Sequence, residues 1–206
     1  MKLITALCAF ILAYTGTANA SLKIGLSVGY SPNYMVNLSG GGTSSGTPYN
    51  ATYALNYNST TEFGIDVWSV QPNSWGFISG YQNSGARKFY SGTANGFPIP
   101  SSSDTSTYQT HFLYGGTAYR WESFYIPLAL TYGMTKFTEA TSSTSTATTK
   151  NGVGAHLGMG WFFNENFVIE YIGRSATTEL KATGSSGSET TTGTVASALL
   201  SLKYFF

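Results

Sequence analysis

Few residues in this chain could carry acid–base or nucleophilic chemistry. It has two histidines, His111 and His156, and a single cysteine, Cys8. Nucleophilic catalysis needs a nucleophile held next to a base, and neither histidine shows a diagnostic spacing to a serine. Three serines and an aspartate at residues 101–104 could form a triad with His111, but serine clusters in low-complexity segments are typical of loops. We therefore predict no enzyme, no transition-metal site and no cofactor.

Charged side chains are the second group of interest, because several lie in segments that alternate bulky apolar residues with small or polar ones. This period of two is typical of a β-strand and directs the charges to the face opposite the apolar residues. On an enclosed face an isolated charge is costly, so we expect ion pairs. The alternative is that water in a partly open interior solvates each charge separately. The predicted network consists of Lys23, Asp66, Glu170, Arg174 and Lys203.

The composition limits the class of protein. Only 9% of the residues are charged and 16% are aromatic, whereas soluble domains are typically about 25% charged. Lysine and arginine number 10 against 9 acidic residues, and no segment concentrates the basic ones. A nucleic-acid-binding protein needs a basic face, so we exclude that class. No charge run or proline-rich hinge divides the chain into domains.

The first twenty residues resemble a secretory signal peptide. Lys2 precedes an apolar stretch at residues 3–14, and small residues end at Ala20. This stretch is shorter than the roughly 20 residues that a membrane-spanning helix needs. We predict cleavage after Ala20, which removes Cys8 and leaves one domain at residues 21–206.

Eight segments show strand patterns, and most alternate without interruption. In the fourth, His111 to Tyr114 break the alternation, so the face of that strand is left open. In the fifth, Pro127 lacks the N–H that a sheet needs, which predicts a bulge or a local break. The predicted strands are 22–30, 49–58, 62–68, 108–121, 124–134, 153–163, 167–174 and 194–206.

Long and short connections alternate between these strands. The short ones lie near 59–61, near Glu122 and at 164–166, and the long ones are rich in Gly, Ser, Thr and Asn. Long connections therefore share one end of the sheet. This pattern predicts an all-β fold, a transmembrane antiparallel up-and-down β-barrel of about eight strands with long loops at one end and short turns at the other. The predicted long loops are 32–48, 71–107, 135–151 and 175–193.

The bulky face of the sheet is predicted to contact lipid, because small glycines and serines fit a narrow lumen better. Leu26, Leu55, Leu128 and Leu200 should accordingly point outward. A soluble barrel, with these residues inside, is the alternative. Tyrosines and tryptophans near strand ends favour two interfacial girdles, although aromatic residues also favour strands in general.

The C-terminal strand ends on an alternating aromatic pattern formed by Leu202, Tyr204 and Phe206. This pattern resembles the assembly signal of bacterial outer-membrane barrels. The mature chain also resembles the small barrels of the OmpA, OmpX and OmpW kind, especially at residues 152–161 and 167–171. The resemblance implies an eight-stranded barrel in the bacterial outer membrane, surrounded by its lipid and inserted by the barrel-assembly machinery.

The function favoured by these patterns is that of a structural or surface-interaction protein. Long external loops would meet an extracellular ligand of unknown identity, and polar side chains would fill the lumen. The alternative is a narrow passive channel for water, ions or small hydrophobic solutes. A membrane-embedded lipid-modifying enzyme that uses His111 and His156 is a third class.

Overall fold

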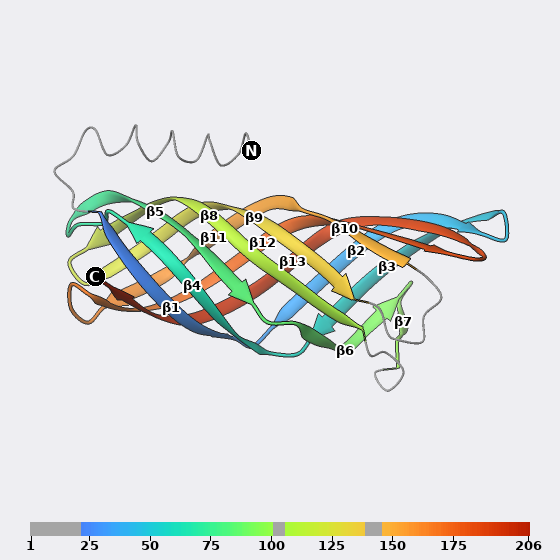
Figure 1. The fold of residues 1–206 in the computed structure, drawn as a ribbon, viewed down its shortest axis with the longest axis horizontal. Helices are drawn as coiled ribbons and strands as arrows, with labels where there is room; N and C mark the ends of the chain where they lie inside the picture. The colour runs from blue at the N-terminus through green and yellow to red at the C-terminus, as the bar shows by residue number, and fades with distance from the viewer. Residues whose placement is uncertain (1–21, 101–105, 139–145) are drawn as a thin grey trace.

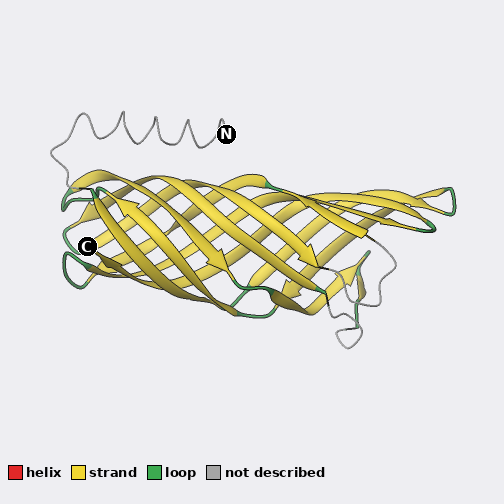
Figure 2. Cartoon of the chain, viewed as in Figure 1, coloured by secondary structure: helices red, strands yellow, loops and turns green. Residues whose placement is uncertain are grey.

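The computed structural model of the chain describes residues 22–100, 106–138 and 146–206. The predicted signal peptide at 1–20 lies outside these described residues. Within them no helix is long and apolar enough to cross a membrane, and the regular structure consists of antiparallel β-strands (Figure 2).

Thirteen strands are present in the described part of the chain. They are β1 (Lys23–Ser31), β2 (Tyr34–Ser44), β3 (Thr47–Tyr57), β4 (Thr60–Trp68), β5 (Ser74–Ser84), β6 (Arg87–Ala94), β7 (Phe97–Pro98), β8 (Thr107–Trp121), β9 (Phe124–Thr138), β10 (Thr146–Lys150), β11 (Gly152–Phe162), β12 (Phe167–Gly184) and β13 (Gly187–Phe205).

Several of these strands are consecutive segments of one longer barrel strand, so the sheet closes with eight strands. The pairs β1 with β2, β3 with β4, β5 with β6 and β10 with β11 each form one barrel strand, and β7 is a short partner of β6. The last strand, β13, pairs with β12 on one side and with both β1 and β2 on the other. This pairing closes the barrel (Figure 1).

Three adjacent barrel strands are interrupted at the same level. We call the part of the barrel between the interruption and the short turns the lower barrel, and the part toward the protruding hairpins the upper barrel. The ladder pairs Ser31 with Thr60 below the interruption and Tyr34 with Tyr57 above it. The neighbouring strand is interrupted between Ser84 and Arg87. Pro32 cannot donate to the ladder, which accounts for the break in the first strand. The predicted turn at 59–61 is therefore wrong, because β3 and β4 run on in one direction.

The predicted loop at 71–107 is also wrong, because it contains the whole barrel strand formed by β5 and β6. The predicted number of eight strands is right although two assignments are wrong. The predicted strands 49–58 and 62–68 are one barrel strand, and the strand formed by β5 and β6 is not among the predicted ones. The signal for β5 and β6 was weak since glycine, serine and asparagine dilute its apolar residues.

Three of the four predicted long connections, 32–48, 135–151 and 175–193, do share one end of the barrel, but most of their residues are in paired strands. The ladder between β12 and β13 continues to Gly184 and Gly187, and the ladder between β2 and β3 continues to Ser44 and Thr47. These two hairpins protrude beyond the rest of the wall (Figure 1). Backbone pairing holds them, so their low apolar content does not make them irregular.

The apolar face of the lower barrel points outward. Leu26, Leu128 and Leu200 are 53%, 53% and 46% exposed, as predicted. Leu55 is the exception, because it packs inside against a cluster that includes Tyr34. It lies above the strand interruption, where Val36 is buried and Asn37 is exposed, so the wall there has an apolar inner face and a polar outer face.

Pro127 interrupts one ladder of β9 without a bulge. Its pairing with Ala118 of β8 keeps the register. Toward β11, β9 is paired at Tyr125 and at Leu128 but not at the two residues between them, and the register is the same before and after this gap. A local break, one of the two predicted outcomes, is thus what the proline causes.

Ring packing inside the lower barrel depends on glycines in the wall. A Cβ on Gly160 would overlap the ring of Tyr125, which is fully buried and packs edge-on against Trp68 and Phe162. Gly173 is exposed, and a Cβ there would touch only a backbone oxygen at 3.9 Å.

Gly160→Ala should therefore lower the free energy of unfolding by about 1–3 kcal/mol, the range for overpacking a close-packed core. Urea-dependent unfolding in detergent micelles, followed by tryptophan fluorescence, measures this effect. Gly173→Ala is the matched control and should change the free energy by less than about 0.5 kcal/mol. Equal effects of the two substitutions would contradict this account of the packing.

Candidate functional site in the barrel interior

The lower half of the barrel interior contains a buried cluster of one cation and two carboxylates. The Nζ atom of Lys203 lies 2.9 Å from Oδ1 of Asp66 and 3.0 Å from Oε1 of Glu170, and these three side chains are fully buried. Tyr114 donates a hydrogen bond to Asp66, and Tyr125 donates one to Glu170. We call these five residues the lower layer.

Small residues on β1 allow the lower layer to form. Lys203 lies on β13 and Asp66 on β4, and β1 runs between these two strands. The residues of β1 that pair with them are Ser27 and Gly25, respectively. Because these inward positions carry almost no side chain, the long lysine reaches across β1 to the carboxylate.

A second charged cluster, the upper layer, contains one carboxylate and two guanidinium groups. Glu62 accepts a hydrogen bond from Arg87 at 2.8 Å and another from Arg174. Arg174 also donates to Gln82 and, at 2.9 Å, to Oγ of Ser197. The three charged side chains are at most 1% exposed, so each pair is desolvated.

Arg87 also stabilises the interrupted part of the wall. Its Nη1 atom donates to the carbonyl oxygens of Ser31 at 3.3 Å and Asn58 at 3.2 Å, both next to the strand interruptions. The same guanidinium lies 4.6 Å from the centre of the Tyr34 ring. A buried carbonyl without a partner is costly, so Arg87 replaces the ladder bonds that the interruption removes.

The two layers have opposite formal charge, since the lower one has two carboxylates for one ammonium and the upper one has two guanidinium groups for one carboxylate. Aromatic rings separate them from the outside. Trp68 lies under the Lys203 ammonium at 4.7 Å, and Phe112 lies under Arg174 at 4.2 Å. Charged and aromatic side chains are thus packed together at both levels of the interior.

The structure brings together three members of the predicted network, Lys203, Asp66 and Glu170. The other two lie elsewhere. Arg174 bonds Glu62 in the upper layer, not Glu170, and Lys23 pairs with Glu165 at the barrel end. Lys23 is too near the start of β1 to reach the lower layer, so placing it in the network is wrong.

Sequence reasoning missed Glu62 and Arg87. Glu62 shares the polar parity of Asp66, and this signal could have identified it, but its place beside the supposed turn at 59–61 hid its role. Arg87 fell in the supposed loop at 71–107. Both omissions follow from the misjudged strands.

The two histidines lie on opposite faces of the wall. His156 is buried in the interior and stacks on Tyr114 with ring centres 4.5 Å apart. His111 stacks on Tyr81 at 6.0 Å on the outer face. They cannot act on one substrate together. Residues 101–104 lie outside the described residues, and no group of three metal-ligating side chains occurs in the described part.

Charged residues also fasten the barrel end that carries the short turns. Glu165 accepts hydrogen bonds from Arg120 at 2.8 and 3.2 Å, and Lys23 donates to its backbone oxygen at 2.6 Å. The hydrogen bond from Arg120 is the main reason why the pKa of Glu165 lies below its ordinary value. Arg120 in turn lies 3.8 Å above the ring of Phe162.

At the opposite end, two tyrosines on the inner face of the protruding sheet share one carboxylate. Tyr49 and Tyr53 donate to Oε2 of Glu189 at 2.8 and 3.1 Å. The hydrogen bond to Glu189 raises the pKa of Tyr49, and burial followed by the same bond raises the pKa of Tyr53. Hydroxyl, carboxylate and ring surfaces therefore meet at this rim.

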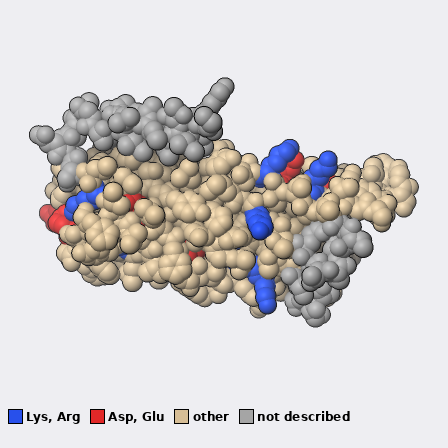
Figure 3. Space-filling view, viewed as in Figure 1, with Lys and Arg blue, Asp and Glu red and all other residues tan. Residues whose placement is uncertain are grey.

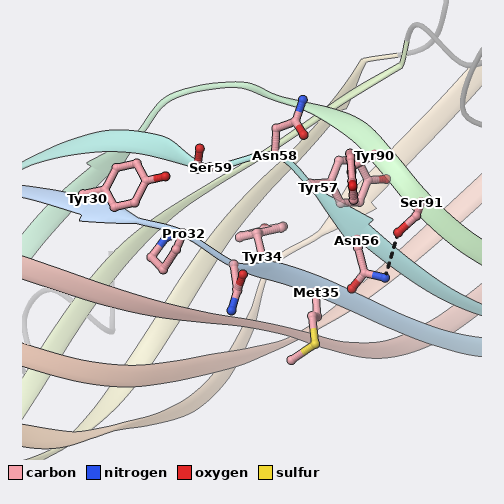
Figure 4. Close-up of a pocket in the computed structure, with 11 residues that line it drawn as sticks. Tyr30, Pro32, Tyr34, Met35, Asn56, Tyr57, Asn58, Ser59, Tyr90 and Ser91 are labelled. Carbon is pink, nitrogen blue, oxygen red and sulfur yellow. Dashed lines mark hydrogen bonds between the residues drawn. The ribbon is translucent and has the colours of Figure 1, made fainter.

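A cavity of about 540 Å³ lies in the wall at the strand interruption (Figure 4). Tyr30 and Tyr90 form its rim and are 52% and 65% exposed, whereas Tyr34 and Tyr57 are nearly buried. The side chains of Asn56 and Ser91 also line the cavity, and a hydrogen bond of 3.4 Å joins them. Tyr34 and Tyr57 also belong to the apolar cluster inside the upper barrel, so the cavity borders that cluster.

The alternating residues of the C-terminal strand point outward. Leu202, Tyr204 and Phe206 are 42%, 49% and 70% exposed. The amide of Phe206 donates to the carbonyl of Ile24 at 2.9 Å, and Phe205 donates to Asn166. The end of the chain is thus tied to both neighbouring strands and presents a continuous apolar face.

Solved structures with a similar fold are outer-membrane proteins. The outer membrane protein OprG from Pseudomonas aeruginosa matches with a TM-score of 0.61 and 12% identity, covering 91% of this chain and 97% of that one. The chain has the fold of a small outer-membrane barrel. Outer membrane protein AlkL matches with a TM-score of 0.55 and 17% identity, over 92% of each chain. No protein-family model matches the sequence, and no curated protein does.

Lys203→Met should lower the free energy of unfolding by about 3–5 kcal/mol, because it leaves two buried carboxylates without a cation. Urea-dependent unfolding of the folded barrel in micelles measures this loss. Lys181→Met removes an exposed lysine that has the same side-chain length, and it should have little effect. If Lys203→Met lowers the free energy of unfolding no more than Lys181→Met does, the described contacts of the lower layer are contradicted.

The ion pair of Glu165 should make stability depend on pH. Since the folded-state pKa is below the ordinary value, the stabilisation is present above the ordinary pKa and is lost as pH falls through the lowered one. Glu165→Gln should therefore be less stable than the wild-type protein at pH 7 and equal to it in strong acid. Unfolding curves of the two proteins across this range test the sign, and a difference that does not change with pH would refute it.

Proposed function

We propose that this protein is a bacterial outer-membrane barrel, exported with cleavage after residue 20, whose apolar outer band contacts lipid hydrocarbon. Outward leucines on β1, β9 and β13 support this location, as does the likeness in fold to OprG and AlkL. The C-terminal strand with Leu202, Tyr204 and Phe206 is the segment that the barrel-assembly machinery recognises in this proposal.

Within that location the protein acts as a sealed, non-catalytic scaffold that presents its protruding hairpins to an external ligand. The single observation that supports this role is the pair of buried charged layers in the barrel interior, which in this proposal fill the lumen. Opening a path through both layers would require separating Lys203 from its two carboxylates and also Glu62 from its two arginines, and each step leaves buried charges without partners. The rim around Glu189 offers the polar and aromatic groups for recognition.

Single-channel recording in planar bilayers tests the sealed lumen. Purified full-length protein should first show a different gel migration before and after boiling, as expected of a folded barrel, and should then give no sustained current. The comparison is a variant that empties part of both layers, with Asp66→Ala and Glu170→Ala in the lower layer and Arg87→Ala and Arg174→Ala in the upper layer. It should conduct if it folds, which the same gel shift checks. Sustained current through the wild-type protein would reject the scaffold role.

A second function is favoured by the cavity in the wall. The cavity lies between exposed tyrosines and the apolar interior cluster. A small hydrophobic solute could therefore pass through the wall at this level, between the upper interior and the outside, without crossing the charged layers. Uptake of an apolar dye into vesicles containing the protein, with no ionic current, would favour this passive route over the scaffold.

A further inference from the structure

Four lysines point outward beyond the apolar outer band of the barrel. Figure 3 shows the basic side chains in two zones, one at the end with the short turns and one across the barrel where the protruding hairpins begin. The second zone is made by the lysines that the structure exposes on β6, β9, β10 and β12. They are Lys88, Lys136, Lys150 and Lys181.

Three of these lysines form no ion pair with any of the described residues. Lys150 pairs with Glu179 at 2.6 Å. For Lys88, Lys136 and Lys181, no carboxylate of the described residues lies within ion-pair distance. The zone is therefore positive, whereas the cations at the opposite end, Lys23 and Arg120, both pair with Glu165.

The lysines lie about one bilayer thickness from outward aromatic side chains near the short turns, which we call the aromatic belt. Thirteen residues separate Lys88 from Trp75, twelve separate Lys136 from Phe124, and fourteen separate Lys181 from Phe167. Strands that rise about 3.4 Å per residue and tilt about 40° cover about 31 to 36 Å over such distances. The lysines are therefore far enough from the belt to cross the hydrocarbon of a bilayer, about 30 Å thick, and enter the headgroups beyond it. With the aromatic belt at one headgroup level, the lysines reach the other.

We propose that Lys88, Lys136 and Lys181 bind the phosphate groups of anionic lipid headgroups in the leaflet around the protruding hairpins. This inference rests on the proposed outer-membrane location. An ammonium group on a flexible stem binds phosphate as a point charge and does not need a preformed pocket. Because the other end of the barrel has no such zone among the described residues, the lysines also fix which leaflet the hairpins cross.

The test measures which lipid stays with the folded barrel. Full-length protein is reconstituted into vesicles of equal parts phosphatidylcholine and phosphatidic acid, extracted in detergent and analysed for retained lipid by mass spectrometry. Wild-type protein should retain phosphatidic acid with an enrichment of about fivefold, the factor that one lysine near a charged surface contributes. The triple substitution Lys88→Gln, Lys136→Gln and Lys181→Gln should retain the two lipids equally.

The triple Lys→Arg variant at the same positions keeps the charge and should keep the enrichment. Added inorganic phosphate should not displace the lipid; displacement at equal concentration would show a site for free phosphate and overturn the lipid assignment. If the wild-type protein inserts and shows the heat-dependent gel shift but retains both lipids equally, this inference fails alone. If it does not insert into vesicles at all, the proposed location fails.

Discussion

The barrel depends on neutralising charges that its narrow closed wall forces into a dry interior. Eight strands leave a lumen that side chains can fill, and inward parity delivers the six charges of the two layers into it from four barrel strands. Lys203 joins β13, β4 and β12, while Glu62 joins the strand of β6 to β12. The glycines and serines of β1, the stacked aromatic rings and the carbonyl contacts of Arg87 all serve to make these pairs possible.

The strand interruption divides the barrel into two regions. Bulky and small or polar residues alternate along the strands in both regions, but the bulky residues face opposite sides of the wall. Below the interruption the bulky residues face outward and the interior holds charge. Above it Tyr34, Val36 and Leu38 turn inward, and polar residues such as Asn37 face outward. In the proposed membrane location, this change marks the level at which the wall leaves hydrocarbon and enters water, because a polar outer face is not penalised in water.

Fold class, strand parity below the interruption and the grouping of Lys203 with Asp66 and Glu170 could be predicted from the sequence, because a strict period of two identifies both the strand and its buried face. Leu55 could not, since its local pattern is the same as that of Leu26 and only its height in the barrel decides its face. Arg87 could not either. Its role depends on carbonyls of Ser31 and Asn58, which become neighbours only after three separate strands have paired.

The position of Lys203 on the last strand has a consequence for assembly. Until that strand docks, Asp66 and Glu170 have no counter-charge, so the unfinished barrel cannot dehydrate its centre. A slip of one residue at the closing seam would turn the lysine toward hydrocarbon and leave both carboxylates unmatched. The buried ammonium group therefore stabilises only the register in which the first and last strands pair correctly.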